Sequence, residues 1–185
     1  MAQPKMSGVV WNAETKKLES TDQLNQVWQI DKINETFKET YSVEGQNLLM
    51  LYKLSLIMQN ACLILRGAGL SAIQIGIPLK FFVALKPGSG SEFITFADSF
   101  YTNEGDEEYT STEGCLSIVS DNKLVFYDVP RHKNIEVIGK SLKVDQVIEL
   151  VPESIKATDF FASVLAHEID HQNMIDISKI GTLKV

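Results

Sequence analysis

The stretch Ala166-His167-Glu168-Ile169-Asp170-His171 contains two histidines four residues apart. On a helix, positions i and i+4 lie on one face, so both imidazoles and the intervening Glu168 reach the same small volume. Two histidines in this arrangement bind a divalent metal ion, and the glutamate lies beside the metal's open position as a general base. The stretch therefore predicts a metal-binding helix, which we expect to begin at Thr158 or Asp159 and to end near Asn173.

An open tetrahedral site needs a third protein ligand, and the chain contains two cysteines. Cys62 lies in an apolar run, where a free cysteine behaves as a small buried hydrophobe. Cys115 follows Gly114, which allows close approach of the backbone, and its thiolate is a strong ligand for a late first-row metal. Taken alone, Cys115 is more often a half-buried core thiol, but beside the histidine helix it is the better third ligand. We expect Asp170 to pair with a nearby cation or to orient the metal-binding helix.

A glycine-containing loop at residues 67–74 is the third candidate segment. The side-chain amide of Gln74 is able to donate to a developing oxyanion, and so is the backbone N–H of Leu116, the residue after Cys115. Taken singly, Gln74 is more often a hydrogen-bonded loop residue. A dinucleotide site is rejected, because the segment follows a helix and lacks the third glycine of that fingerprint.

The rest of the chain predicts an α+β fold, with antiparallel β-sheets packed around the C-terminal metal-binding helix and a buried N-terminal helix. That N-terminal helix is expected over 46–66, apolar on several sides and therefore well buried, with Gly67 as its C-cap glycine. The first forty-odd residues predict a strand or extended arm and a turn or two of helix. Strands are expected at 80–85, 93–102, 123–129, 134–139 and 147–150, with turns at 87–90, 104–106 and 129–131.

Composition limits the function classes. The 185 residues predict one domain, residues 1–185, with 44% apolar residues and a net charge of −7. Without a cluster of lysines and arginines, direct binding to nucleic acid or to anionic lipid is not expected. Two cysteines in a chain of this length do not form a disulfide framework, and no signal peptide or membrane span is apparent. We therefore expect a cytoplasmic protein.

Together the three segments resemble one family, the peptide deformylases, whose members carry GxGLxAxQ, EGCLS and HExDH in this order. Here these motifs occupy residues 67–74, 113–117 and 167–171, and the resemblance extends from about residue 46 to 176. It implies a single deformylase-like catalytic domain. Fourteen residues follow His171, so the chain is similar to the C-terminally trimmed members found in phages.

The resemblance also implies roles for individual residues. Glu113 is expected to support the site through a basic partner, for which Arg131 is the candidate. The expected metal ligands are Cys115, His167 and His171. The expected catalytic groups are Glu168 as general acid and base, with Gln74 and the Leu116 N–H stabilising the oxyanion. The substrate-binding residues are expected to be Gly69, through its backbone, and Ala68, Phe160 and Val164 around the methionine side chain.

The implied reaction is removal of the N-formyl group from the initiator methionine of nascent polypeptides, with release of formate. Ferrous iron is the implied native metal, with zinc or nickel in recombinant protein, and the implied form is a monomer acting near the ribosome. Two alternatives remain: a zinc endopeptidase, which usually takes a third histidine or a glutamate as ligand, and a non-catalytic metal-binding homologue. The chain departs from the family pattern at Ala166 and Met174, and between Ser117 and Pro130.

Overall fold

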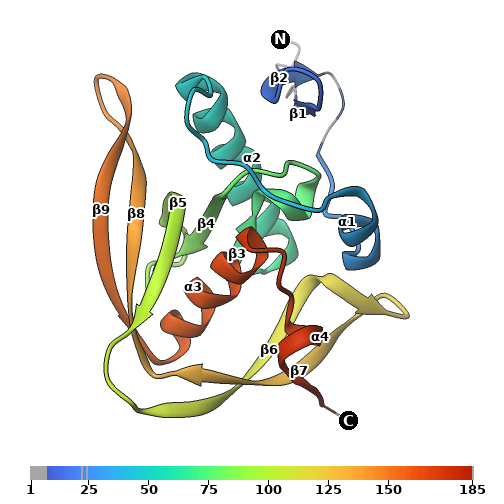
Figure 1. The fold of residues 1–185 in the computed structure, drawn as a ribbon, viewed down its shortest axis with the longest axis vertical. Helices are drawn as coiled ribbons and strands as arrows, with labels where there is room; N and C mark the ends of the chain where they lie inside the picture. The colour runs from blue at the N-terminus through green and yellow to red at the C-terminus, as the bar shows by residue number, and fades with distance from the viewer. Residues whose placement is uncertain (1–7, 22, 24, 185) are drawn as a thin grey trace.

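The computed structural model describes residues 8–184 except 22 and 24, and its architecture is α+β, as the sequence predicts. A central helix, α3 (Asp159–Gln172), runs diagonally between two antiparallel sheets (Figure 1). The larger sheet has the order β3 (Gly69–Ser71), β4 (Phe81–Leu85), β5 (Phe93–Asn103), β8 (Asn134–Val144) and β9 (Ile148–Thr158). The smaller sheet has the order β10 (Thr182–Leu183), β7 (Lys123–His132) and β6 (Glu108–Ser120).

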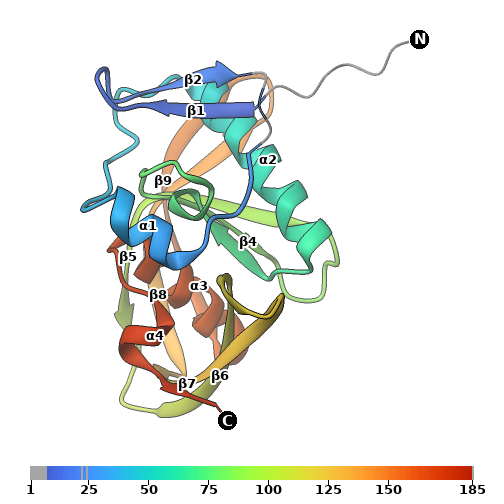
Figure 2. The ribbon, with the colours of Figure 1, turned by 90° about the vertical axis from the view of Figure 1, so that its right-hand side faces the viewer.

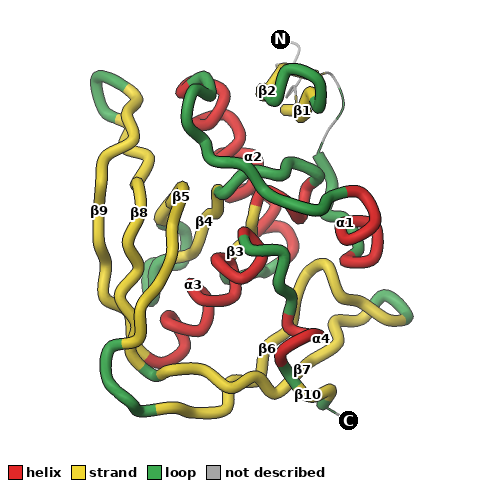
Figure 3. Tube along the Cα trace, in the orientation of Figure 1, coloured by secondary structure: helices red, strands yellow, loops and turns green. Residues whose placement is uncertain are grey.

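The remaining elements surround this core, as the colouring by secondary structure in Figure 3 shows. A separate hairpin of β1 (Gly8–Asn12) and β2 (Lys17–Thr21) is followed by the short helix α1 (Ile30–Thr36). This agrees with the strand and short helix expected for the first forty residues. The other elements are α2 (Leu48–Leu65), the 3₁₀ turn η1 (Ala72–Ile75) and α4 (Ile177–Ile180).

Helix α3 is buried on both sides because its two faces carry different kinds of residue. One face packs apolar side chains against the larger sheet, where they meet Phe82, Phe96 and Val137. The apolar residues that α3 contributes recur at helical spacing: Ala162, Leu165, Ala166 and Ile169. The other face carries His167, Glu168 and His171, all less than a tenth exposed. The apolar face therefore fixes the direction in which the histidine face points.

Helix α2 agrees with its predicted extent but not with its predicted burial. It begins after Asn47, whose side chain caps the helix by accepting hydrogen bonds from the backbone of Leu49 and Met50. Leu51, Leu54, Met58 and Cys62 are fully buried, the last as expected. Three of the apolar residues expected to complete the burial are instead exposed: Leu49 by 63%, Leu56 by 46% and Ile64 by 70%. The prediction of a well-buried helix is thus wrong for the outer side of α2.

Helix α2 as a whole has the length and mean hydropathy of a helix able to span a membrane. Core helices of soluble proteins share this length and hydropathy, so these two properties alone are weak evidence for a membrane span. In this structure the inner side of α2 packs against β1, β3, β4 and β9.

The C-terminus of α2 also differs from expectation. The left-handed residue that ends the helix is Arg66 (φ 57°, ψ 36°), not Gly67. Gly67 is needed for space instead, because a Cβ there would lie 2.9 Å from Leu116 Cδ1. The segment expected to be a loop at 67–74 forms the edge strand β3 followed by η1.

Most predicted strands are present, but β6 was missed and one predicted turn is wrong. The predicted turn at 129–131 lies inside β7, where Pro130 is opposite Thr110 of β6. Strands β8 and β9 continue to Val144 and Thr158, well beyond their predicted ends. The register of β6 against β7 shifts between Gly114 and Val119, so the segment between them is not paired with β7.

Candidate metal centre

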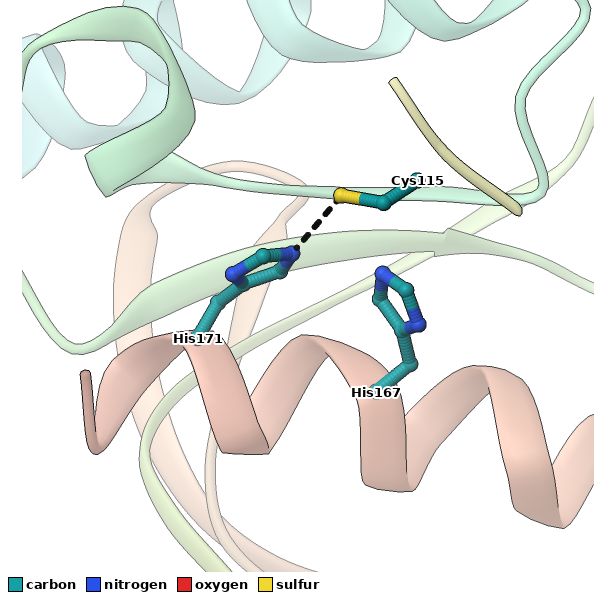
Figure 4. A group of neighbouring side chains, drawn as sticks. All are labelled: Cys115, His167 and His171. Atoms are coloured by element: carbon teal, nitrogen blue, oxygen red, sulfur yellow. Dashed lines mark hydrogen bonds between the residues drawn. The ribbon is translucent and has the colours of Figure 1, made fainter. Parts of the chain in front are cut away.

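Three side chains that were predicted to bind a metal converge in the interior. The sulfur of Cys115 and a ring nitrogen from each of His167 and His171 all lie within 4.8 Å of one another, and all three residues are buried. Figure 4 shows both imidazoles rising from α3 toward the cysteine, with Cys115 Sγ 3.3 Å from His171 Nε2. The helical spacing aligns the histidines, and the irregular part of β6 brings the cysteine over them.

The chemistry of these donors fits a single divalent metal ion. His167 Nδ1 lies 2.9 Å from Glu113 Oε2, which leaves the other ring nitrogen for a metal. The pKa of His171 is well below its usual value, chiefly because burial disfavours its protonation. Its neutral ring therefore offers a lone pair. One thiolate and two imidazoles suit a late first-row ion and leave a fourth position open, as in catalytic sites.

Arg131 connects two carboxylates behind the histidines. Its Nε and Nη2 donate to Glu113 at 2.7 and 3.0 Å, and its Nη1 donates to Asp170 Oδ2 at 2.6 Å. Burial alone would raise the pKa of Glu113, but hydrogen bonds from Arg131 and His167 outweigh it and lower that pKa to about 2. The expected partner of Glu113 is thus present, and the same guanidinium is the cation beside Asp170.

We predict that replacing Arg131 with methionine lowers the free energy of unfolding by about 3–5 kcal/mol at pH 7, because two carboxylates are left buried without their cation. The loss depends on pH with a definite sign. In the wild type the folded-state pKa of Glu113 lies below its unfolded value near 4.3, so its contribution is present above about pH 4 and is lost toward pH 2. In the variant the folded-state pKa of Glu113 rises instead. Lowering the pH then protonates this buried carboxylate and reduces the loss of stability.

Urea unfolding at pH 7 and pH 4, with chelator present, measures this difference. The gap between variant and wild type should be smaller at pH 4. The control is Lys86→Met, which removes an ion pair with Glu92 whose two side chains are 48% and 68% exposed, and which should cost less than about 1 kcal/mol. Equal losses for the two variants would show that the buried network contributes no more than a surface pair.

Glu168 lies beside the metal ligands and is 4% exposed. Burial, together with the nearby carboxylates of Glu113 and Asp170, raises its pKa to about 7, although the neighbouring His167 acts in the opposite direction. Its Oε2 is buried and has no hydrogen-bond partner among the residues that the structure describes. Gly69 allows the backbone of β3 to pass close by, since a Cβ there would lie 2.6 Å from Glu168 Oε1. This carboxylate is poised to exchange a proton near neutral pH.

Gln74 is held in one orientation by its neighbours. Its Oε1 accepts a hydrogen bond from the Ser71 backbone at 2.8 Å, and its Nε2 donates to Cys115 Sγ at 3.5 Å and Ser117 Oγ at 3.2 Å. The N-terminal segment supports it, because Trp28 N donates to the carbonyl of Gln74 at 2.7 Å. Trp28 thus helps to fix the turn that carries a predicted oxyanion donor.

A pocket of about 270 Å³ opens above Glu168 and His167. Besides Glu168 and His167, its wall contains all the predicted catalytic and substrate-binding residues: Ala68, Gly69, Gln74, Leu116, Phe160 and Val164. Cys115 and His171 are not among the residues that line it. Phe160 is 69% exposed and Val164 is 9% exposed, so the first stands at the mouth and the second in the interior.

Several pocket residues were missed by sequence reasoning. Leu124 and Phe126 of β7 carry no local signal, since only the pairing of β7 with β6 places them there. Ser163 lies one turn before His167, so helical spacing could have identified it. Arg66 and Gly67 enter the wall from the end of α2.

Comparison with known proteins gives a consistent family assignment. The family model described as polypeptide deformylase matches residues 14–179. The chain is similar to a peptide deformylase of Agrobacterium fabrum (31% identity over 121 residues, 64% of this chain and 65% of the relative). It is also similar to one of Bartonella tribocorum (34% over 110 residues, 57% of this chain and 56% of the relative). Each match thus spans less than two thirds of the relative's length.

The fold is shared with solved structures of this family. A probable peptide deformylase from Synechococcus phage S-SSM7 superposes with a TM-score of 0.68 at 23% identity, covering 84% of this chain and 99% of the phage chain. At this level of identity the likeness concerns the fold alone.

Proposed function

The chain belongs to the polypeptide deformylase family, and on this premise we propose that it removes the N-formyl group from the initiator methionine of nascent polypeptides and releases formate. One observation carries the proposal. A buried carboxylate, Glu168, lies next to a Cys–His–His donor set at the base of a largely apolar pocket. A binding module has no need of such a carboxylate beside an open metal position.

The mechanism assigns separate tasks to the residues of this chain. Cys115, His167 and His171 would hold the metal ion, which supplies Lewis acidity and lowers the pKa of water at the site. Glu168 accepts the proton of the attacking water and later returns it to the leaving amine. Gln74 Nε2 and the Leu116 N–H donate to the oxygen that becomes negatively charged. Ala68, Phe160 and Val164 surround the methionine side chain.

The edge position of β3 gives the substrate a place to bind. β3 pairs with β4 on one side only, and at its start Gly69 is only half-buried, so the outer edge at Gly69 is available to an extended peptide. We further propose that residues 1–185 act as one catalytic domain, as a cytoplasmic monomer with ferrous iron as the native metal and zinc or nickel as substitutes. Its substrates would be formylated chains emerging from the ribosome, without direct contact to nucleic acid or membrane.

Formate release from formyl-Met-Ala-Ser by anaerobically prepared, iron-loaded protein tests the proposed reaction. Turnover of this peptide, without cleavage of unformylated peptides, is the expected result. No turnover at full metal occupancy would favour a non-catalytic metal-binding homologue. Cleavage of internal peptide bonds would favour a zinc endopeptidase.

Gly69→Ala is expected to lower kcat about 10–100-fold while metal content stays the same. The added Cβ would lie 2.6 Å from Glu168 Oε1 and 2.8 Å from its Cγ, so the carboxylate must move. Displacing a catalytic group by about 1 Å has effects of this size. The double variant with Glu168→Gln should be no slower than Glu168→Gln alone. A further loss in the double variant would show that Gly69 acts independently of Glu168.

A further inference from the structure

Arg66 stands at the mouth of the pocket in an unusual setting. It is exposed, it ends α2, and it is the single lysine or arginine among the described residues of the pocket wall. No ion pair joins it to any residue that the structure describes. The substrate pocket therefore has one unpaired positive charge at its entrance.

Arg66 ends α2 in a backbone conformation that glycine adopts more easily than arginine. Its φ of 57° lies in the left-handed region, which glycine normally occupies at the end of a helix. Seven described non-glycine residues have a positive φ, and of these Arg66 alone lines the pocket, which is a reason to look for a role there. Figure 2 shows the C-terminal end of α2 near the β6–β7 hairpin, in keeping with the close approach of Gly67 to Leu116 of β6.

The path of a bound peptide leads toward Arg66. The formyl end must lie near Glu168, which is beside Gly69. Beyond Gly69 in one direction, Leu70, Ser71 and Ala72 are fully buried, so a polypeptide is unable to leave that way. In the other direction Gly67 and Arg66 lead to the exposed end of α2. Arg66 lies three positions before Gly69 and lines the same pocket, so the third residue of a peptide whose formyl end is at Gly69 is the one placed toward Arg66.

We propose that Arg66 selects formylated peptides that carry a negative charge at the third residue, either an aspartate or glutamate side chain or the terminal carboxylate of a tripeptide. This inference rests on the proposed function. The whole chain has a net charge of −7, so acidic peptides are otherwise disfavoured. The guanidinium of Arg66 is a local positive charge on this negatively charged protein. Its planar group presents two N–H donors in the geometry that a carboxylate accepts.

The test compares kcat/KM for formyl-Met-Ala-Asp, formyl-Met-Ala-Asn and formyl-Met-Ala-Lys, all amidated at the C-terminus so that the third side chain carries the only variable charge. We expect the aspartate peptide to exceed the asparagine peptide about two- to fivefold and the lysine peptide about tenfold at low salt. The differences should vanish near 1 M salt. Arg66→Gln should abolish the preference, Arg66→Glu should reverse it, and Arg66→Lys should keep part of it.

Arg66→Gly separates this role from a purely structural one. Glycine relieves the left-handed strain, so thermal stability should rise while the charge preference disappears. If the wild type discriminates no better than Arg66→Gly, the inference is wrong, even though deformylation itself proceeds.

Binding of the same three peptides to the metal-loaded Glu168→Gln protein keeps the inference testable without turnover. The dissociation constants should follow the same order, and Arg66→Glu in that background should reverse it. An unchanged order would overturn the role of Arg66. Absence of turnover by the wild type on every peptide, with the order of binding intact, would instead count against the proposed reaction.

Discussion

Glu168→Gln is expected to lower kcat/KM for formyl-Met-Ala-Ser by about 10²–10⁴, while the protein keeps its full metal content. Glutamine preserves the shape of the side chain but has no basic oxygen to accept the proton of water. The effect should be large because Glu168 has a pKa raised to about 7 and is the group placed beside both Gly69 and the histidines. Steady-state formate release and metal analysis of the same samples measure the two quantities.

The matched control for this variant is Glu149→Gln on the exposed part of β9, which removes the same charge far from the pocket. It should leave kcat/KM unchanged. If Glu168→Gln keeps more than about a tenth of wild-type activity, some other group transfers the proton and the role given to Glu168 is wrong.

Cys115→Ala is expected to reduce bound metal from one ion per chain to nearly none after dialysis, and to abolish deformylation with it. Two imidazoles alone hold a divalent ion much more weakly than two imidazoles and a thiolate. Elemental analysis by mass spectrometry, with formate release on the same preparation, provides the measurement.

Cys62→Ala is the control, since Cys62 is the other buried cysteine of the chain and burial raises the pKa of its thiol. It should retain the metal and lose only about 1–2 kcal/mol of stability through the small cavity left behind. A Cys115→Ala protein that keeps one ion and cleaves unformylated peptides would instead support the endopeptidase alternative.

The part of the site that follows local geometry was predictable from the sequence. The spacing of His167 and His171 fixes a common helix face, and both the helix and its extent were predicted. The pairing of Glu113 with Arg131 was also expected, and the hydrogen bonds confirm it.

Strand β6 was missed for a physical reason that concerns the site itself. Its inward-facing positions alternate with exposed ones, as in any half-buried strand. At those positions stand Ser111, Glu113, Cys115 and Ser117, all buried and mostly polar. A search for apolar alternation passes over such a strand. Strand β6 was therefore not recognised because its buried positions carry the polar residues of the site.

Other features depend on contacts between distant segments, which no local pattern records. The exposure of Leu56 and Ile64 reflects which elements of the chain reach α2. The need for glycine at position 67 depends on Leu116, which a Cβ there would meet at 2.9 Å. Pairing of β7 with β6 brings Leu124 and Phe126 into the pocket.

X-ray absorption spectroscopy of the zinc-loaded protein tests the metal centre most directly. A single ion held by Cys115, His167 and His171 predicts one sulfur at about 2.3 Å, two imidazole nitrogens at about 2.0–2.1 Å and one light atom from solvent. The sulfur contribution should disappear in Cys115→Ala and persist in Cys62→Ala. A shell without sulfur, or one closed by four protein ligands, would contradict the account.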